Sequence, residues 1–208
     1  MGELKIQQSR CSWCTSDALY IEYHDHEWGR VTLDDQALFE RLALEGMQAG
    51  LSWLTVLKKR QAMQRQFGQF DIAWLAKRGA TKLDQWLANA DLIRHRGKLE
   101  AMLHNARLVH QHHRQAGSFA QMVWSFAPAT HVVHQPGQTP AFTKEATAMA
   151  KHLKQAGFRF VGPTTCYAFM QSVGMVNDHV VHCLAYHDCL KQWTHSMRPT
   201  SATAIEST

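Results

Sequence analysis

The sequence predicts an all-α fold. Apolar residues recur three or four positions apart in one segment after another, and the strict alternation typical of a half-buried strand is nearly absent. Apolar residues make up 45% of the 208 positions and charged residues 19%, a composition that excludes a disordered chain and a long charged coiled coil. A chain of this length buries roughly 70% of its unfolded surface, which is enough for one sizeable core.

The first helices are expected on either side of two glycines. Asp34 and Asp35 suit the cap of a helix N-terminus, and apolar residues at helical spacing follow them. Gly46 and Gly50 then interrupt the pattern, and a second apolar stretch ends in the basic run 58–60.

The remaining helices are predicted from apolar stripes and from their end signals. Residues 127–142 contain three prolines and Gly137, so we expect a loop there between two fused helical lobes. Gly157 supplies the C-terminal stop of the helix that follows this loop. We expect residues 1–198 to form a single compact domain and the Ser/Thr/Ala-rich tail 199–208 to be disordered. The expected helical segments are a short one around Trp86, a longer one around 99–109, and others at 119–126, 143–156, 165–173 and 177–186.

Charge and cysteine usage narrow the class of protein. The chain has 22 Lys+Arg against 17 Asp+Glu, and its isoelectric point near 9.0 suits an anionic partner such as nucleic acid. No apolar run is long enough to span a membrane, and the first ten residues lack the apolar core of a secretory signal, so we expect a cytoplasmic protein. Its five cysteines, an odd number, favour metal ligation or buried thiols over disulfides.

A zinc site is predicted from cysteines and histidines near the two ends of the chain. His179 and Cys183 are four residues apart on an expected helix, which stacks their side chains on one face. Cys11 and Cys14 form a C-x-x-C pair, and His24 lies ten residues beyond it. Four such ligands would form a closed structural site that holds the two ends of the chain together. The spacing leaves open whether Cys14 or His24 is the fourth ligand, and a core thiol beside a surface histidine is the alternative.

The segment 160–165 has the features of an anion-binding turn. Gly162 lies between two expected helices, where backbone N–H groups are exposed and the next helix presents its positive N-terminus. Arg94, Arg96 and Lys98 cluster at another helix start. Together with the positive net charge, these features favour contact with nucleic-acid phosphates. An ordinary helix–helix turn and solvated basic faces are the alternative.

Aromatic residues surround one acidic residue in the N-terminal third. Glu45 lies within an apolar stretch before a glycine, and if it is buried it needs a hydrogen-bond donor or a cation. An aromatic slot with one carboxylate suits an extruded cationic base, because rings stack on its faces and the carboxylate contacts its edge. Packing in the hydrophobic core is the alternative for the aromatic residues, which are Trp13, Tyr20, Tyr23, Trp28 and Trp53.

Six segments of the chain resemble the DNA-3-methyladenine glycosylase I family. The similarity runs from about residue 10 to residue 187 and keeps the order of the family's motifs. It implies an all-α fold of the helix-hairpin-helix glycosylase superfamily. The segments are R-C-x-W at 10–13, Y-x-x-Y-H-D-x-E-W-G at 20–29, L-E-G-x-Q-A-G-L-S-W-x-T-V-L at 44–57, I-R-H-R-G-K at 93–98, G-F-x-F-V-G at 157–162 and V-N-D-H-V-V at 176–181.

The resemblance also implies the residues of each site. Cys14 lies outside the family's zinc site, and Leu51 corresponds to a residue that fills the gap left by a flipped nucleotide. The implied zinc ligands are Cys11, His24, His179 and Cys183. The implied base pocket consists of Tyr23, Glu45 and Trp53, with Trp13 nearby. Further contacts with DNA are expected from Gly162, Thr164, Thr165, Arg96 and Lys98.

The implied activity is hydrolytic removal of 3-methyladenine from alkylated double-stranded DNA, which leaves an abasic site. We expect Trp53 to stack on the flipped base, Tyr23 to hydrogen-bond to it, and Glu45, the catalytic residue, to recognise its edge and charge. Methylation at N3 makes the base cationic and weakens its bond to the sugar, so little acid catalysis is needed. The protein is expected to be a monomer with one structural zinc ion and no organic cofactor.

Two positions depart from the wider superfamily. Related glycosylases carry a catalytic Asp two residues before a His, where this chain has Asn177, and lyase-active members carry a Lys where Pro163 follows the hairpin glycine. A monofunctional enzyme without a Schiff-base lyase step is therefore expected, and Asp178 is expected to cap a helix. Two other functions stay open, which are a non-catalytic zinc-stabilised DNA-binding module and a zinc hydrolase with an open coordination site.

Overall fold

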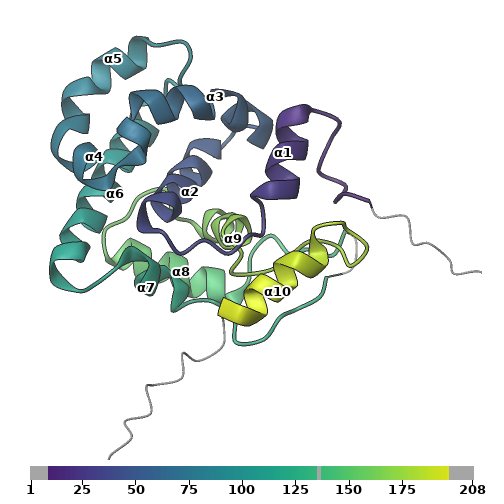
Figure 1. The fold of residues 1–208 in the computed structure, drawn as a ribbon. Coiled ribbons are helices and arrows are strands. Elements are labelled where there is room, and N and C mark those ends of the chain that lie inside the picture. Colours follow the sequence, from purple (N-terminus) through teal and green to yellow (C-terminus); the bar gives the residue numbers. More distant parts are fainter. Residues whose placement is uncertain (1–8, 135–136, 197–208) are drawn as a thin grey trace, which may run out of the picture.

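Helices account for the regular elements in the part of the chain that the structure describes (Figure 1). The computed structural model describes residues 9–134 and 137–196, and the tail predicted at 199–208 lies outside these ranges. Within them the chain forms no strand beyond one isolated bridge between Ser9 and Cys183, so the predicted all-α class is confirmed. The helices are α1 (Ala18–His26), α2 (Asp35–Gln48), α3 (Trp53–Gln66), α4 (Ile72–Arg78), α5 (Leu83–Ala88), α6 (Arg96–Gln115), α7 (Phe119–Trp124), α8 (Lys144–Gln155), α9 (Pro163–Ser172) and α10 (Tyr186–Ser196), with 3₁₀ turns at Gly68–Phe70 and Gly79–Lys82. None of these described helices combines the length and apolar character needed to cross a lipid bilayer.

Helix α2 forms the centre of the larger hydrophobic core. Asp34 caps its N-terminus as predicted, because the carboxylate accepts a hydrogen bond of 2.8 Å from the backbone N–H of Ala37. The apolar face of α2, which includes Leu38, Leu42 and Met47, packs among α3, α6, α7 and α9. Because neighbours hold this helix on several sides, the polar residues of its last turns are fixed in position.

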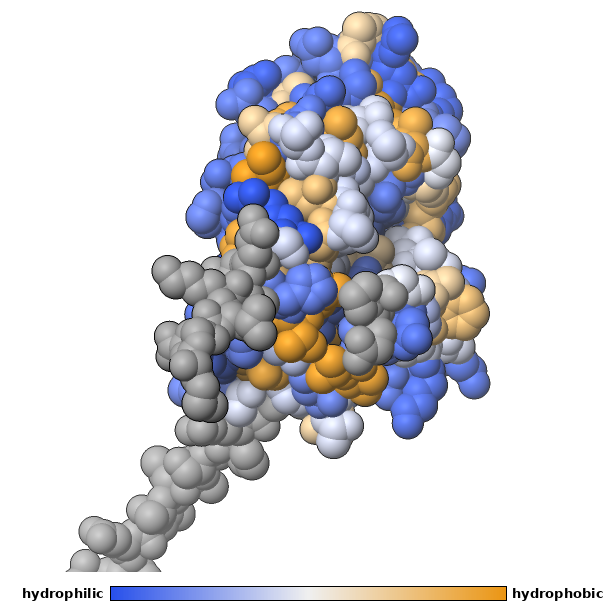
Figure 2. Space-filling model, turned by 90° about the vertical axis from the view of Figure 1, so that its right-hand side faces the viewer, coloured by the Kyte–Doolittle hydropathy of each residue, from blue (hydrophilic) through white to orange (hydrophobic). Residues whose placement is uncertain are grey.

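A smaller core joins segments from the two ends of the described chain. Trp53 packs against both cores, so it lies at their junction. Figure 1 shows the N-terminal segment (purple) close to the loop that leads into α10 (yellow), where Ser9 and Cys183 pair. Figure 2 views the molecule from this side, and apolar surface interrupts the hydrophilic surface there. The buried members of the smaller core are Cys11, Tyr23, Trp28, Leu57, Cys183, Ala185, Tyr186 and Cys189.

The prediction of a helix at 177–186 is wrong. Residues 177–185 form turns and irregular structure, and α10 begins only at Tyr186. The side-chain amide of Asn177 donates to the Tyr186 carbonyl (3.0 Å), and its oxygen accepts from the backbone N–H of His179 (3.3 Å). These local bonds compete with helical hydrogen bonding. His179 and Cys183 therefore share no helix face, although their side chains still meet.

Other helix ends also differ from expectation. Helix α3 continues to Gln66 instead of ending at the basic run 58–60. Arg60 within that run pairs with Glu27 and Glu40, whereas Lys58 is exposed. Helix α9 begins two residues earlier than predicted, at Pro163, where a helix needs no N–H donor. Helices α1, α4 and α10 were not predicted.

Candidate active site

A cavity of about 440 Å³ lies where the smaller core meets α2 and α3. This volume falls within the usual range of small-molecule sites. Gln48, Gln171 and Asp178 contribute polar groups to its wall. The wall also contains every residue that the sequence predicted for a base pocket, namely Trp13, Tyr23, Glu45 and Trp53.

Glu45 places a buried acid in the wall of this cavity. It lies near the C-terminal end of α2, and only 6% of its surface is exposed. Burial raises the pKa of Glu45 to about 8, and the positive charge of Arg41 opposes this rise. No hydrogen bond from the described part of the chain stabilises its ionised form. The carboxyl group is therefore available to a donor or a positive charge on a ligand.

Trp53 and Tyr23 form an aromatic wall beside this acid. Trp53 begins α3, and its ring centroid lies 5.2 Å from that of Tyr23 with the planes tilted by 53°. The indole Nε1 of Trp53 is buried and has no hydrogen-bond partner within the described residues. Trp13 lies further along the wall, 6.4 Å from Tyr23. A flat aromatic ligand can stack on these rings while its edge faces Glu45.

Arg41 lies behind the pocket and was not predicted from the sequence. Its guanidinium carbon is 5.5 Å from the centre of the Tyr23 ring, which is the geometry of a cation–π contact. Its Nη2 pairs with Glu27, which Arg60 also binds, whereas Nη1 is buried without a partner among the described residues. Arg41 thus supports the Tyr23 ring and places positive charge one helical turn before Glu45. That four-residue spacing is the signal by which it could have been found.

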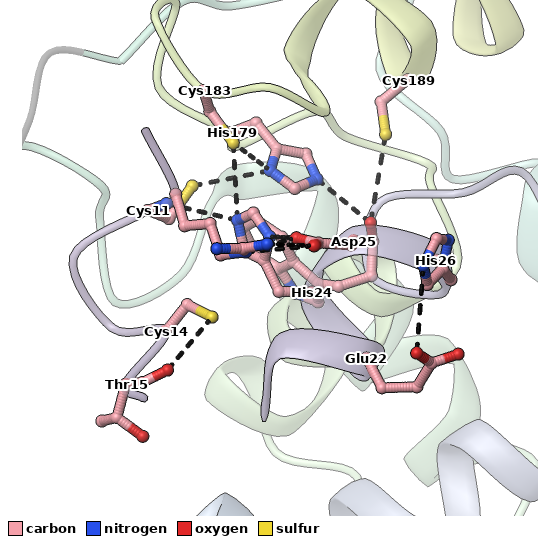
Figure 3. A network of polar contacts seen from close by, with 12 residues as sticks. Cys11, Cys14, Thr15, Glu22, His24, Asp25, His26, His179, Cys183 and Cys189 are labelled. Atoms are coloured by element: carbon pink, nitrogen blue, oxygen red, sulfur yellow. Dashed lines mark hydrogen bonds and ion pairs between the residues drawn. The ribbon is translucent and has the colours of Figure 1, made fainter. Parts of the chain in front are cut away.

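Two cysteines and two histidines meet in a buried cluster next to this pocket (Figure 3). The Sγ atom of Cys183 lies 3.3 Å from Nδ1 of His179 and 3.4 Å from Nε2 of His24. The Sγ atom of Cys11 lies 3.5 Å from Nδ1 of His179. All four donor atoms lie within 4.8 Å of one another. The cluster brings together the four zinc ligands that the family resemblance implied.

The surrounding hydrogen bonds prepare both histidines for a metal ion. Nδ1 of His24 contacts the Asp25 carboxylate at 2.7 Å, and Nε2 of His179 contacts the Trp28 carbonyl at 3.1 Å. Arg10 in turn grips Asp25. Each imidazole therefore donates outward and turns its other nitrogen, as a lone-pair donor, toward the sulfur atoms. Two thiol sulfurs and two imidazole nitrogens are the donor set of a tetrahedral zinc site.

His24, and not Cys14, lies in the cluster. The Cys14 thiol points away from it and donates to the Thr15 carbonyl at 3.7 Å. Cys183 carries the thiol most ready to bind a cation, because hydrogen bonds from Cys11, His179 and His24 lower its pKa.

The turn before α9 is exposed and rigidly held. Gly162 caps α9, while Thr164 is exposed and Thr165 half-buried in its first turn. The side chain of Asn105 holds this turn, because it donates to the Arg159 carbonyl (3.0 Å) and accepts from the Arg159 N–H (2.9 Å). The sequence analysis missed this clamp. The exposed helix start has the geometry of a phosphate site.

Other predicted DNA contacts occupy different surroundings. Leu51 is 39% exposed at the turn between α2 and α3. Arg96 is exposed and pairs with Asp84 at 2.9 Å. Lys98 is buried, and its ammonium donates to two backbone carbonyls instead of facing solvent. Its expected phosphate contact is therefore not supported by its position.

Asp178 does not cap a helix, contrary to expectation. One carboxylate oxygen accepts hydrogen bonds from the Tyr167 hydroxyl (2.6 Å) and the Gln171 amide (2.7 Å). The other oxygen is buried and has no hydrogen-bond partner within the described residues. The residue is thus a structural part of the cavity wall.

The fold and the site define a helical protein with an aromatic pocket that contains one buried acid, next to a cluster of cysteines and histidines that could hold a metal ion. Residues 13–187 match the methyladenine glycosylase family, and the chain belongs to this family. The resemblance seen in the sequence motifs is thereby confirmed.

Individual relatives are similar over most of their length. The chain is 46% identical to DNA-3-methyladenine glycosylase of Haemophilus influenzae over 178 residues, which cover 84% of this chain and 96% of the relative. It is 46% identical to DNA-3-methyladenine glycosylase 1 of Escherichia coli over 185 residues, or 85% and 96% of the two chains. A crystal structure of a 3-methyladenine DNA glycosylase I matches with a TM-score of 0.82 and 45% identity, over 86% of this chain and 100% of that chain. The Staphylococcus aureus 3-methyladenine DNA glycosylase I matches with a TM-score of 0.80 and 34% identity, over 85% and 96%.

Proposed function

We propose that this protein removes 3-methyladenine from alkylated double-stranded DNA by hydrolysis and leaves an abasic site. The observation that carries the proposal is the carboxyl of Glu45, which is buried in an aromatic-walled cavity and receives no hydrogen bond from the residues that the structure describes. Adenine methylated at N3 carries a positive charge in DNA, so the rings and the acid match its faces and its charge. The relatives from Haemophilus influenzae and Escherichia coli carry the name of this activity, and the Staphylococcus aureus enzyme is described as recognising 3-methyladenine.

In this mechanism the protein extrudes the damaged nucleotide and holds its base in the cavity. Trp53 stacks on the base, Tyr23 hydrogen-bonds to it, and the Glu45 carboxylate accepts a hydrogen bond from its edge and balances its charge. The bond between the sugar and the base then breaks, and its electron pair neutralises the departing cationic base. Water adds to the sugar carbon and loses a proton, which completes the hydrolysis.

Asn177 supports a mechanism without the superfamily's catalytic Asp. Its side chain is 2% exposed and engaged with the Tyr186 carbonyl and the His179 N–H. It is therefore committed to the fold and lacks an acidic group. Since Pro163 stands where lyases have a Lys, the enzyme forms no Schiff base, and borohydride traps no covalent adduct with DNA.

Zinc has a structural role in this proposal. Four imidazole or thiolate donors would complete the tetrahedral coordination of a zinc ion and leave no position for water, which argues against a zinc hydrolase. When bound, the ion cross-links the segment before α1 to the loop before α10. The residues that hold it are Cys11, His24, His179 and Cys183.

The DNA duplex is proposed to bind across the exposed turns near the cavity. Leu51 fills the gap in the base stack, and Arg96 contacts the DNA backbone. The start of α9, with Gly162, Thr164 and Thr165, offers backbone and hydroxyl donors to a phosphate. Action as a monomer and a cytoplasmic location stay predictions.

The decisive experiment measures release of free base from methylated duplex DNA. Glu45→Gln keeps the shape of the side chain but removes its charge, and we expect release to fall roughly 30- to 1,000-fold, since a charge-assisted contact is worth about 2–4 kcal/mol. Glu22→Gln, at an exposed position on α1, is the matched control and retains wild-type release. Absence of 3-methyladenine release by the wild type, with DNA binding intact, would instead indicate the non-catalytic binding module.

A further inference from the structure

The side chain of Lys98 joins the end of α2 to the start of α6. Only 7% of the residue is exposed. Its Nζ donates to the Met47 carbonyl at 2.8 Å and to the Ala49 carbonyl at 2.5 Å. Its own backbone N–H is held by His95, the N-cap of α6, at 3.2 Å. The Lys98 side chain is therefore fixed at its base by α6 and at its tip by the two carbonyls that the ammonium binds.

The Met47 carbonyl lies in the last turn of α2, and the Ala49 carbonyl begins the turn that connects the acid of the pocket to its aromatic wall. Helix α2, which carries Glu45, ends at Gln48, and α3 begins with Trp53. Between them Gly50 adopts a left-handed conformation (φ 74°), and Leu51 is exposed at the tip. The position of Leu51 relative to the pocket thus depends on this short turn.

Lysine is suited to hold this turn. The last carbonyls of an α-helix have no partner within the helix, and a cation near that end is favoured by the helix dipole. Burial lowers the pKa of Lys98, so the ammonium needs the two carbonyl bonds to remain charged there. The Lys98 ammonium is therefore positioned to hold the backbone of this turn and not to contact a DNA phosphate.

We propose that Lys98 is a positioning residue that locks the 49–52 turn, so that Leu51 can enter the duplex when the damaged nucleotide leaves it. This inference rests on the proposed function. A side chain that enters the base stack has to keep its position against the stacked bases. A turn that is anchored to a second helix keeps Leu51 in place better than an unanchored turn. The role is needed only when a duplex has to be opened, because single-stranded DNA has no stack to hold apart and free base needs no wedge.

The test compares three variants by their activity on two DNA substrates and by their affinity for free 3-methyladenine. Lys98→Met keeps the apolar stem and removes the ammonium, whereas Lys98→Arg restores a cation. Lys59→Met is the matched control, because Lys59 on α3 also donates to a carbonyl, that of Ala90, at 2.7 Å. The measurements are kcat/KM for release of 3-methyladenine from methylated duplex, the same for methylated single strands, and the dissociation constant of free 3-methyladenine.

We expect Lys98→Met to lower kcat/KM on duplex about tenfold or more, with changes below twofold on single strands and for free base. Lys98→Arg should recover at least half of the lost duplex activity, and Lys59→Met should stay within twofold of wild type. Equal losses of activity on both DNA substrates and of affinity for free base, or no loss of activity on duplex, would overturn the proposal. Failure of the proposed function looks different, since the wild type itself would then release no 3-methyladenine from either DNA.

A second variant covers the case in which Lys98→Met does not fold. Gly50→Ala places a side chain where no atom lies within 4 Å, so it disturbs only the left-handed backbone of the turn. We expect the same selective loss on duplex DNA. Unchanged duplex activity in this variant would count against the locked turn.

Discussion

At the scale of single residues, the charge of the pocket depends on pH through the protonation of Glu45. Its carboxyl lies in an apolar helix face, where burial raises the pKa from an ordinary 4.5 to about 8. The folded protein therefore keeps a proton that the unfolded chain releases above pH 4.5. The same burial that destabilises the ionised form makes the site attract a cation, because an entering positive charge favours ionisation.

This proton predicts a pH-dependent stability. The contribution of the neutral carboxyl is fully present below pH 4.5 and is lost as pH rises through 8, since ionisation of a buried acid opposes folding. We expect the free energy of unfolding of the wild type to fall by roughly 3–5 kcal/mol relative to Glu45→Gln between pH 4.5 and 8. Urea unfolding of both proteins across this range measures the difference. A difference that does not change with pH would show that the carboxyl is not buried as described.

At the scale of elements, we propose that a metal ion held by the Cys/His cluster stabilises the loop before α10. Residues 177–185 have no regular structure, yet they carry His179 and Cys183 into contact with α1. The hydrogen bonds of Asn177 and the cluster fix this loop in place of a helical ladder. An ion that joins it to the N-terminal segment takes the part that a disulfide plays in an oxidising compartment.

Removal of the metal is therefore predicted to lower thermal stability. Cys11→Ser, or treatment with a strong chelator, should lower the melting temperature by about 10 °C or more, because losing a few kcal/mol shifts a domain of this size by about 2–4 °C per kcal/mol. Elemental analysis should give one zinc per wild-type chain. Cys14→Ser is the control and should keep both the metal and the melting temperature, since its thiol lies outside the cluster. Wild-type protein that folds equally well without metal would contradict the prediction.

Helical periodicity and caps predicted several elements correctly, and tertiary contacts explain the failures. Asp34 and the apolar spacing after it identified α2, and Gly157 marked the end of α8. At 177–186 the same spacing misled, because side-chain bonds of Asn177 override helix propensity. The prediction that His179 and Cys183 meet was correct, although the shared helix face used to predict it does not exist.

The sequence could predict part of the site for similar reasons. Glu45 stood out because a lone acid in an apolar stretch needs a partner. Arg41 was overlooked, and Lys98 was assigned to DNA instead of to backbone carbonyls, because the direction in which a long basic side chain points depends on the neighbouring helices. Nor could spacing choose between Cys14 and His24, and the family resemblance was needed there.

At the scale of the whole molecule, the pocket forms where several segments of the N-terminal third meet Gln171 and Asp178, which lie more than 100 residues further along the chain. Trp13 precedes α1, Tyr23 lies in α1, Glu45 in α2 and Trp53 at the start of α3. The larger core positions α2, and the smaller core closes the wall that carries Tyr23. The proposed specificity for a charged base thus depends on the packing of both cores.

The overall charge predicts a weak dependence of DNA binding on salt. The formal net charge is only +5, and Arg10, Arg41 and Arg60 are already paired with carboxylates. Among the residues proposed to contact the duplex, Arg96 alone is basic, so we expect about three phosphate contacts at most and a loss of affinity of roughly 40-fold between 50 and 200 mM salt. Fluorescence anisotropy with an undamaged duplex measures this dependence.

Two variants locate these contacts. Arg96→Gln should weaken binding and reduce the slope of log affinity against log salt by about one, because it removes the cation that we propose to contact the DNA backbone. Lys191→Gln, at an exposed position on α10, should leave the slope unchanged. A thousandfold loss of wild-type affinity over the same salt range would instead require about five or six phosphate contacts, about twice the expected number. An unchanged slope in Arg96→Gln would remove the start of α6 from the DNA-binding face.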